Sequence, residues 1–213
     1  MSTSSWPQDK GKGWYNEKGW FLGCNYAPST AVNQLEMWEA DTFDPKTIDR
    51  ELSWAEGLGF NTLRVFLHHL LWQHDPEGLK QRMEHFLTIA SRHHLGVMFV
   101  IFDGVWNPHP KVGHRECVPG VHNSGWLQSP GAEILRDLKR HDELEGYVKG
   151  IISHFSNDSR IHSWDLFNEP DNINPSSYLK FEPENKADLS LILLKKTFAW
   201  ARSVKPSQPL TAG

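Results

Sequence analysis

Residues 161–170 read Ile-His-Ser-Trp-Asp-Leu-Phe-Asn-Glu-Pro, a strand-like run that stops abruptly at Asn168-Glu169-Pro170. Large apolar residues followed at once by a polar turn predict a buried β-strand over 161–167. Pro170 fixes the backbone of that turn. The segment therefore predicts a strand that presents the carboxyl group of Glu169 at its C-terminal end.

Four other short apolar segments predict further strands, and amphipathic segments lie between them. The strands are expected over 21–25, 61–66 and 97–102, with the opening of another at 209–213. Asp44-Pro45 and Asp75-Pro76 each place a capping residue before a proline at the first helical position. Strands that alternate with helices in this way predict a parallel sheet of the α/β class. The four main helices are expected at 44–57, 75–96, 144–155 and 189–204.

The number of repeats predicts part of a (β/α)₈ TIM barrel. The chain has 213 residues, whereas a complete barrel typically needs roughly 250. About four and a half βα units are present, and Gly213 falls inside the expected fifth strand. We therefore expect residues 1–213 to be the N-terminal part of a single barrel domain that is truncated after about strand five.

A long loop follows the third expected strand. It runs from about Gly104 to Pro130, is rich in Gly, Pro and Asn, and contains Trp106 and Trp126. Loops of this length are usually functional, and loop aromatics favour ligand contact. The apolar face of a sugar's pyranose ring packs well against the flat indole of a tryptophan. The alternative is that these two tryptophans only cover the loop.

The chemistry is expected where parallel strands end, because the βα loops converge there. Trp164, Leu166 and Phe167 predict an apolar setting for Glu169. Such a setting disfavours the carboxylate and raises its pKa, which suits a general acid near neutral pH. The alternative reading of Glu169 is a helix-start or salt-bridging residue.

The segment from Trp164 to Pro170 resembles the strand-four signature of the clan of retaining glycoside hydrolases that includes the family 5 cellulases and mannanases. This resemblance implies that Glu169 is the catalytic acid/base. It implies that Asn168 hydrogen-bonds the 2-hydroxyl group of the sugar, an interaction that strengthens in the transition state. It further implies a second carboxylate, the nucleophile, at the end of a seventh strand that would lie beyond Gly213.

Two other strand ends are similar to the same clan. Gly59-Phe-Asn-Thr-Leu-Arg64 resembles its second strand, in which the arginine supports the nucleophile. A guanidinium inside a strand is costly to bury alone, so Arg64 also predicts an acidic partner inside the barrel, or an inter-strand salt bridge. Phe102-Asp103-Gly104 matches the third strand end in part, because Val105 stands where a histidine often follows. Asp103 is predicted either to contact the ligand or to cap the loop.

The resemblance extends from Gly19 onward and includes bacterial proteins described as cellulase-like or β-1,4-xylanase-like. It implies hydrolysis of a β-linked polysaccharide or oligosaccharide by a retaining two-carboxylate mechanism, with mannan, xylan and glucan all open. The alternative is a non-catalytic carbohydrate-binding fragment or pseudoenzyme, because the nucleophile is absent from these residues. The substrate-binding residues expected beside the catalytic Glu169 are Arg64, Asp103, Trp106, Trp126 and Asn168.

Composition argues against several other functions. The net charge of −4 comes without a basic cluster, so no nucleic-acid partner is expected. No membrane-spanning run and no signal peptide are visible, which makes the cytoplasm the default location. Cys24 and Cys117 are expected to be free thiols. Oligomeric state is left open.

The histidines raise one rival function, a metal-dependent hydrolase. There are 12, with pairs at His68-His69 and His93-His94. No His-Glu-x-x-His motif and no His-x-His motif on a strand accompanies them, and His93-His94 is expected at a helix end, where positive charge is favoured. We therefore expect neither a metal ion nor another cofactor.

Overall fold

The structure is a computed structural model that describes residues 5–175 and 177–213. In this part of the chain five parallel strands form one sheet, in the order in which they occur in the sequence. All of them were expected, with ends that differ by at most two residues. They are β1 (Gly23–Tyr26), β2 (Thr62–Phe66), β3 (Gly96–Val100), β4 (Ile161–Asp165) and β5 (Leu210–Thr211).

The main helices also lie where the sequence predicts them. The side chain of Asp44 accepts hydrogen bonds from the backbone N–H groups of Lys46 and Thr47, and that of Asp75 accepts one from Gly78. These bonds satisfy donors that a helix leaves free in its first turn. Both expected caps are therefore confirmed. The helices are α2 (Pro45–Gly57), α4 (Pro76–Arg92), α6 (Glu145–His154) and α7 (Lys186–Ser203).

Several shorter helical elements were not expected. The 11-residue helix α1 has no buried residue, so its sequence lacks the apolar stripe by which a surface helix is recognised. The others are too short for a helical period to be visible. The unexpected elements are α1 (Gln8–Lys18), α3 (His69–His74), α5 (Ala132–Arg136), η1 (Arg140–Leu144) and η2 (Leu179–Phe181).

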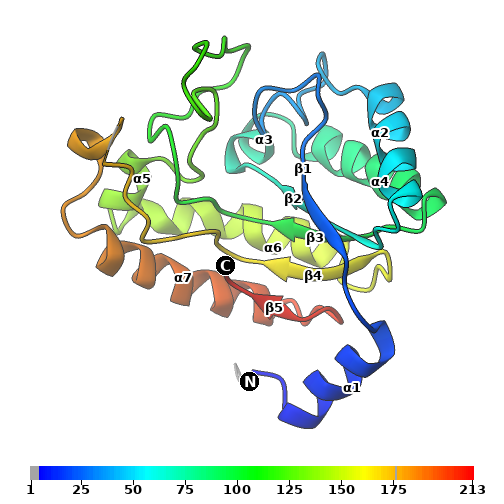
Figure 1. Cartoon of the computed structure of the whole chain (residues 1–213). Coiled ribbons are helices and arrows are strands. Elements are labelled where there is room, and N and C mark those ends of the chain that lie inside the picture. The colour runs from blue at the N-terminus through cyan, green and yellow to red at the C-terminus, as the bar shows by residue number, and fades with distance from the viewer. Residues whose placement is uncertain (1–4, 176) are drawn as a thin grey trace.

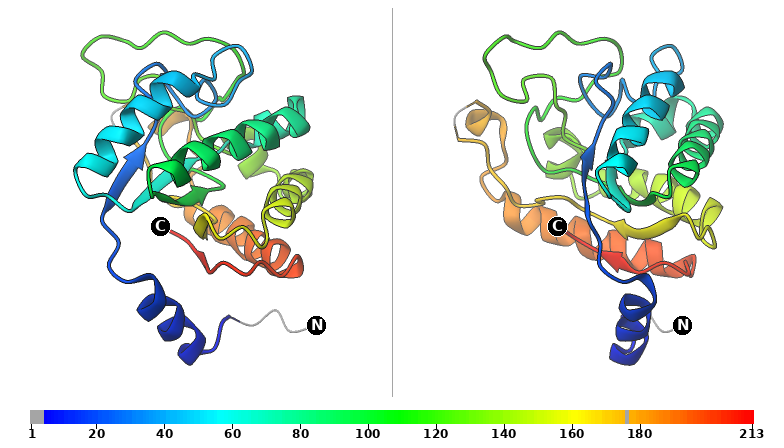
Figure 2. Two further views of the ribbon diagram at one scale, coloured as in Figure 1. Left: turned by 90° about the vertical axis from the view of Figure 1, so that its right-hand side faces the viewer. Right: turned by 45° about the vertical axis from the view of Figure 1, so that its right-hand side comes forward.

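The helices and the sheet pack as layers around one apolar core. Figure 1 shows α4 and α6 behind the sheet and α7 beside β5, and Figure 2 shows α2, α4, α6 and α7 as an arc on one side of the strands. The rings of Phe99 on β3 and Trp164 on β4 stack in the core with their centroids 5.8 Å apart. Helix α1 lies apart from the arc, beyond the start of β1. Among the described residues no helix has both the length and the apolar character that a membrane crossing requires.

The long segments that follow β3 and β4 rise from the same end of the sheet (Figure 1). This end is the C-terminal edge of the strands, where the sequence places its candidate residues. The two cysteines, Cys24 on β1 and Cys117 in the long loop after β3, are exposed and are not bonded to each other, as expected.

Candidate active site

A cavity of about 550 Å³ lies at the C-terminal ends of β2, β3 and β4. All six residues proposed from the sequence line it, although they come from three strand ends and from the loop after β3. They are Arg64, Asp103, Trp106, Trp126, Asn168 and Glu169. The structure therefore brings together residues that are up to about a hundred positions apart in the chain.

Glu169 is held by backbone contacts while its side chain stays exposed. Its backbone φ is 43°, a left-handed conformation that is unusual for a residue with a side chain. Its N–H donates to the carbonyl oxygen of Gly213 at 3.0 Å, and its carboxylate accepts a hydrogen bond from the side-chain amide of Asn172. A Cβ atom on Gly104 would collide with the Glu169 carbonyl oxygen, so the two backbones can meet only because residue 104 is glycine.

The apolar setting expected around the Glu169 carboxyl group is wrong. Trp164, Leu166 and Phe167 are buried, at 0–1% exposure, but they pack into the core rather than around the carboxyl group. The reason is geometric, because the chain turns away from the strand direction at Glu169. The carboxyl group therefore faces the cavity and solvent, with Asn172 as its polar neighbour.

Arg64 has the acidic partner that its place in a strand predicts. Its guanidinium lies 2.5 Å (Nη2) and 3.0 Å (Nε) from Oδ2 of Asp165 on β4. Nη2 also donates to Oδ1 of Asn168 at 2.7 Å, and Nη1 donates to Asn25 at 3.3 Å. The arginine thus neutralises a buried carboxylate and fixes the amide of Asn168 at the same time.

Asp103 continues this network toward the loop. It is 1% exposed and accepts hydrogen bonds from the indole N–H of Trp126 at 2.6 Å and from Nδ2 of Asn168 at 2.9 Å. Burial raises the pKa of its carboxyl group to about 6, although these hydrogen bonds act in the opposite direction. Its Oδ1 also accepts a 3.3 Å bond from the N–H of Val105, which is the capping contact that the sequence left open.

The two ends of the long loop are joined to each other. Asp103 and Ser129 exchange two backbone hydrogen bonds, at 2.7 and 2.9 Å. Within the loop, Trp106 and Asn123 have positive φ angles of 73° and 49°, and both line the cavity. Like Glu169, they hold conformations that non-glycine residues adopt rarely, and such residues concentrate at functional sites.

The paired histidines have structural contacts. His68 and His69 are buried and bond to Gln128 and Ser129 near the end of the loop. Burial lowers the pKa of His69 to about 3 and that of His68 well below its ordinary value, so both rings are neutral near pH 7. Within the described residues, no three His, Cys, Asp or Glu side chains gather as metal ligands would.

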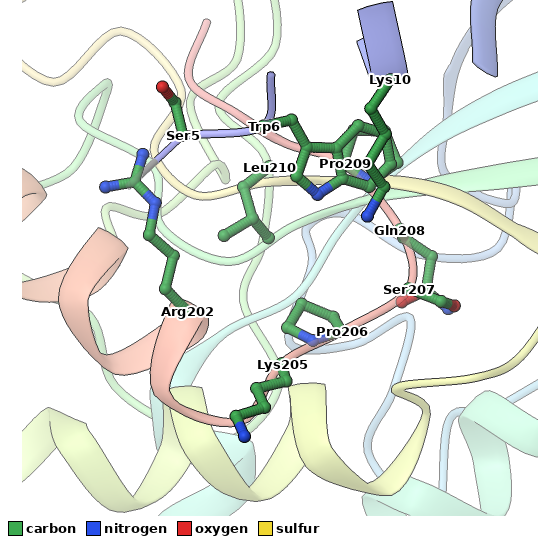
Figure 3. Close-up of a pocket in the computed structure, with 10 residues that line it drawn as sticks. All are labelled: Ser5, Trp6, Lys10, Arg202, Lys205, Pro206, Ser207, Gln208, Pro209 and Leu210. Carbon is green, nitrogen blue, oxygen red and sulfur yellow. The ribbon is translucent and has the colours of Figure 1, made fainter. Parts of the chain in front are cut away.

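A second cavity, of about 560 Å³, lies at the opposite end of the sheet, before β5. Figure 3 shows the indole of Trp6 against Pro209, with Lys10 above the ring and Lys205 pointing away from both. Among the described residues its lining holds no carboxylate and no histidine. It therefore lacks the acid and base groups that the first cavity offers.

Several solved structures share this fold. The endo-1,4-β-mannanase of Eisenia fetida has a TM-score of 0.62 at 13% sequence identity, over 91% of this chain and 57% of that protein. A GH5_18 protein of Streptomyces cattleya in complex with GlcNAc gives a TM-score of 0.56 at 13% identity, over 89% of this chain and 44% of that one. The fold is GH5-like, that is, like that of glycoside hydrolase family 5. The exo-β-1,4-mannosidase of Opitutaceae bacterium strain TAV5 gives a TM-score of 0.59 at 20% identity, over 91% of this chain and 31% of that one.

The GH5-like fold is thus matched over nearly all of this chain, which spans less than two thirds of each of the three proteins. Comparisons with protein-family models and with curated protein sequences find no match. The expected fold class, a partial (β/α)₈ barrel, is confirmed by these solved structures.

Sequence reasoning missed several residues of the site. Asp165 carried a visible signal, because a charged residue within an apolar strand needs a buried partner. Asn123 and Asn172 carried none, since asparagines are common in loops. Lys186, at the start of α7, is buried behind the site, and nothing in the surrounding sequence distinguishes it from an exposed lysine.

Proposed function

We propose that this chain contributes the acid/base part of a retaining glycoside hydrolase that cleaves β-linked glycans, with Glu169 as the proton donor. The observation that carries the proposal is the exposed carboxyl group of Glu169, held in a rare backbone conformation at the wall of a 550 Å³ cavity. A glycosidic oxygen leaves readily only when it is protonated. An accessible carboxyl group beside two tryptophans is suited to supply that proton.

The neighbouring residues have distinct roles in this proposal. Asn168 uses its Oδ1 for Arg64 and one N–H for Asp103, which leaves a second amide hydrogen for a sugar hydroxyl group. Trp106 and Trp126 offer ring faces to the sugar. Arg64 orients Asn168. Residues 1–213 would then form one part of a single catalytic domain.

A retaining mechanism needs a second carboxylate about 5 Å from the first. In the described part of the chain, the carboxylates that line the cavity are Asp103 and Glu169. Asp103 is buried and accepts hydrogen bonds from Trp126 and Asn168, and Asp165 is paired with Arg64, so neither carboxylate is free to act as the nucleophile. We propose that the nucleophile comes from outside residues 1–213. The same observation favours a second candidate function, glycan binding without cleavage.

The substrate that we test first is β-1,4-linked mannan. Two of the compared proteins are a β-1,4-mannanase and a β-1,4-mannosidase, and the third is bound to GlcNAc. Soluble β-glucan and xylan complete the panel, because their rings present a similar apolar face to a tryptophan.

The test is reducing-sugar release and glycan affinity for the full-length protein and two variants. We expect Glu169→Gln to lower kcat by about a hundredfold or more while the Kd for glycan stays within about twofold. Asp171→Asn, which removes an exposed carboxylate two residues away, is the matched control and keeps wild-type turnover. Near-normal turnover of Glu169→Gln contradicts the assignment. Binding without any sugar release from the wild type favours the second candidate function.

A further inference from the structure

Lys186 places a buried ammonium group directly behind the candidate active site. Its side chain has 0% exposure. Nζ donates to the carbonyl oxygen of Gly104 at 2.5 Å, to that of Asn172 at 2.6 Å, and to Oε1 of Glu182 at 2.9 Å. A lysine ammonium has three donors, so each of them has a partner.

The two carbonyl groups belong to the segments that hold Glu169. Gly104 packs against the carbonyl group of Glu169, and its N–H bonds to the carbonyl oxygen of Asn168 at 2.9 Å. Asn172 donates its side-chain amide to the Glu169 carboxylate. Lys186 therefore joins, from behind, the segment after β3 and the turn after β4.

Glu182, the counter-charge of Lys186, links this lysine to the long loop after β3. Glu182 is 7% exposed, and its Oε1 also accepts a 2.6 Å bond from Nε2 of Gln128, which reaches the carbonyl oxygen of Trp106 at 3.1 Å. A buried ion pair is seldom more stabilising than apolar residues of the same size, because both charges lose their hydration. Burial accordingly lowers the pKa of Lys186, against the pull of Glu182. Stability alone does not account for a charge at this place.

We propose that Lys186 is a positioning residue for the proposed hydrolysis, holding Gly104 and Asn172 so that the Glu169 carboxyl group faces the cavity. Its effect on turnover rests on the proposed function. Its effect on the environment of Glu169 does not, and this difference allows the two ideas to be tested separately.

The first readout is the ¹³C chemical shift of the Glu169 carboxyl carbon at fixed pH, assigned by its loss in Glu169→Gln. We expect Lys186→Met to move this signal in the same direction as Asn172→Ala does. In the Asn172→Ala background Lys186→Met is expected to add little, since both act on Glu169 through one contact. A lysine that matters only for global stability leaves the folded-state signal unmoved.

The matched control is Lys196→Met, on the same helix. Lys196 is 32% exposed and pairs with Asp142 at 2.7 Å, away from the cavity lining. We expect it to leave the Glu169 signal in place. If Lys186→Met does not fold because Glu182 is left unpaired, the double variant Lys186→Met/Glu182→Leu removes both charges and carries the same expectation. A Glu169 signal that coincides with the wild-type signal in the folded variant overturns the proposal.

The second readout is turnover by the full-length protein. We expect Lys186→Met to lower kcat about tenfold or more with KM within about twofold, because a misplaced acid slows the chemistry rather than binding. Wild-type kcat in Lys186→Met overturns the positioning role. If the wild type neither binds nor cleaves glycans, the proposed function fails, and the Glu169 signal still decides whether Lys186 positions it.

Discussion

The guanidinium of Arg64 on β2 reaches past β3 to the carboxylate of Asp165 on β4, with Nη2 2.5 Å from Oδ2. The carboxylate is 2% exposed and the arginine side chain 23% exposed. One ion pair therefore links two strands that are not neighbours in the sheet. Through its bond to Asn168 it also fixes the residue that precedes the candidate acid.

Removal of this arginine leaves a buried carboxylate without its partner. We expect Arg64→Met to lower the free energy of unfolding by about 3 kcal/mol, measured by urea denaturation at pH 7. Arg92→Met is the control, because the Arg92–Asp49 pair is largely exposed and is worth at most about 1 kcal/mol. Equal losses in the two variants contradict a buried role for the Arg64–Asp165 pair.

Asp103 should titrate within the range of ordinary buffers. Because burial favours its neutral form, its pKa of about 6 means that the carboxylate is present above pH 6 and the protonated acid below it. Protonation weakens the bond from Trp126, so tryptophan fluorescence is expected to change with a midpoint near pH 6. Asp103→Asn and Trp126→Phe each abolish the transition, and Trp106→Phe retains it. A transition that survives both substitutions is inconsistent with this assignment.

The buried pair His68 and His69 predicts a loss of stability in acid. Their folded-state pKa values are lowered, so the unfolded chain takes up protons below about pH 6.5 that the folded chain does not. Stability is thus present above pH 6.5 and falls by roughly 1 kcal/mol per pH unit for each histidine below it. Urea denaturation at pH 7.5 and pH 5 measures this loss. His69→Gln reduces the pH dependence, whereas His94→Gln, at an exposed site, leaves it unchanged.

Gly104 is expected to tolerate no side chain. The Cβ of an alanine at this position would collide with the Glu169 carbonyl oxygen, so Gly104→Ala should lower the free energy of unfolding by about 1–3 kcal/mol and reduce turnover. Gly57→Ala is the control, because nothing lies within 4 Å of a Cβ at that position in α2. Thermal unfolding and reducing-sugar assays compare the two variants. If the two variants have similar stability and turnover, the close approach of the Gly104 and Glu169 backbones matters for neither.

Much of the architecture was predictable because the signals are local. Asp44-Pro45 and Asp75-Pro76 predict helix starts from side-chain chemistry within one turn of helix. The apolar run 97–102 predicts a buried strand in the same way. Helix α1 has no buried residue, so its sequence offered no comparable pattern.

The candidate site was predictable only as a set of strand ends. Parallel strands end at one edge of the sheet, which is why Arg64, Asp103 and Glu169 could be expected near each other. Their exposures could not be predicted. Glu169 is exposed, whereas its apolar neighbours in the sequence predicted an apolar setting, and no sequence pattern indicated that Asp103 is buried.

The sequence by itself determined the order of strands and helices, the helix caps, and the strand ends that carry polar groups, since each depends on residues close together in the chain. Only the tertiary structure decided which charge pairs with which. Asp165 meets Arg64 because separate segments pack together, and the same packing buries Lys186, whose partner Glu182 is only four residues away in the chain. Burial and electrostatic partnership are properties of that packing, and a local sequence pattern does not contain them.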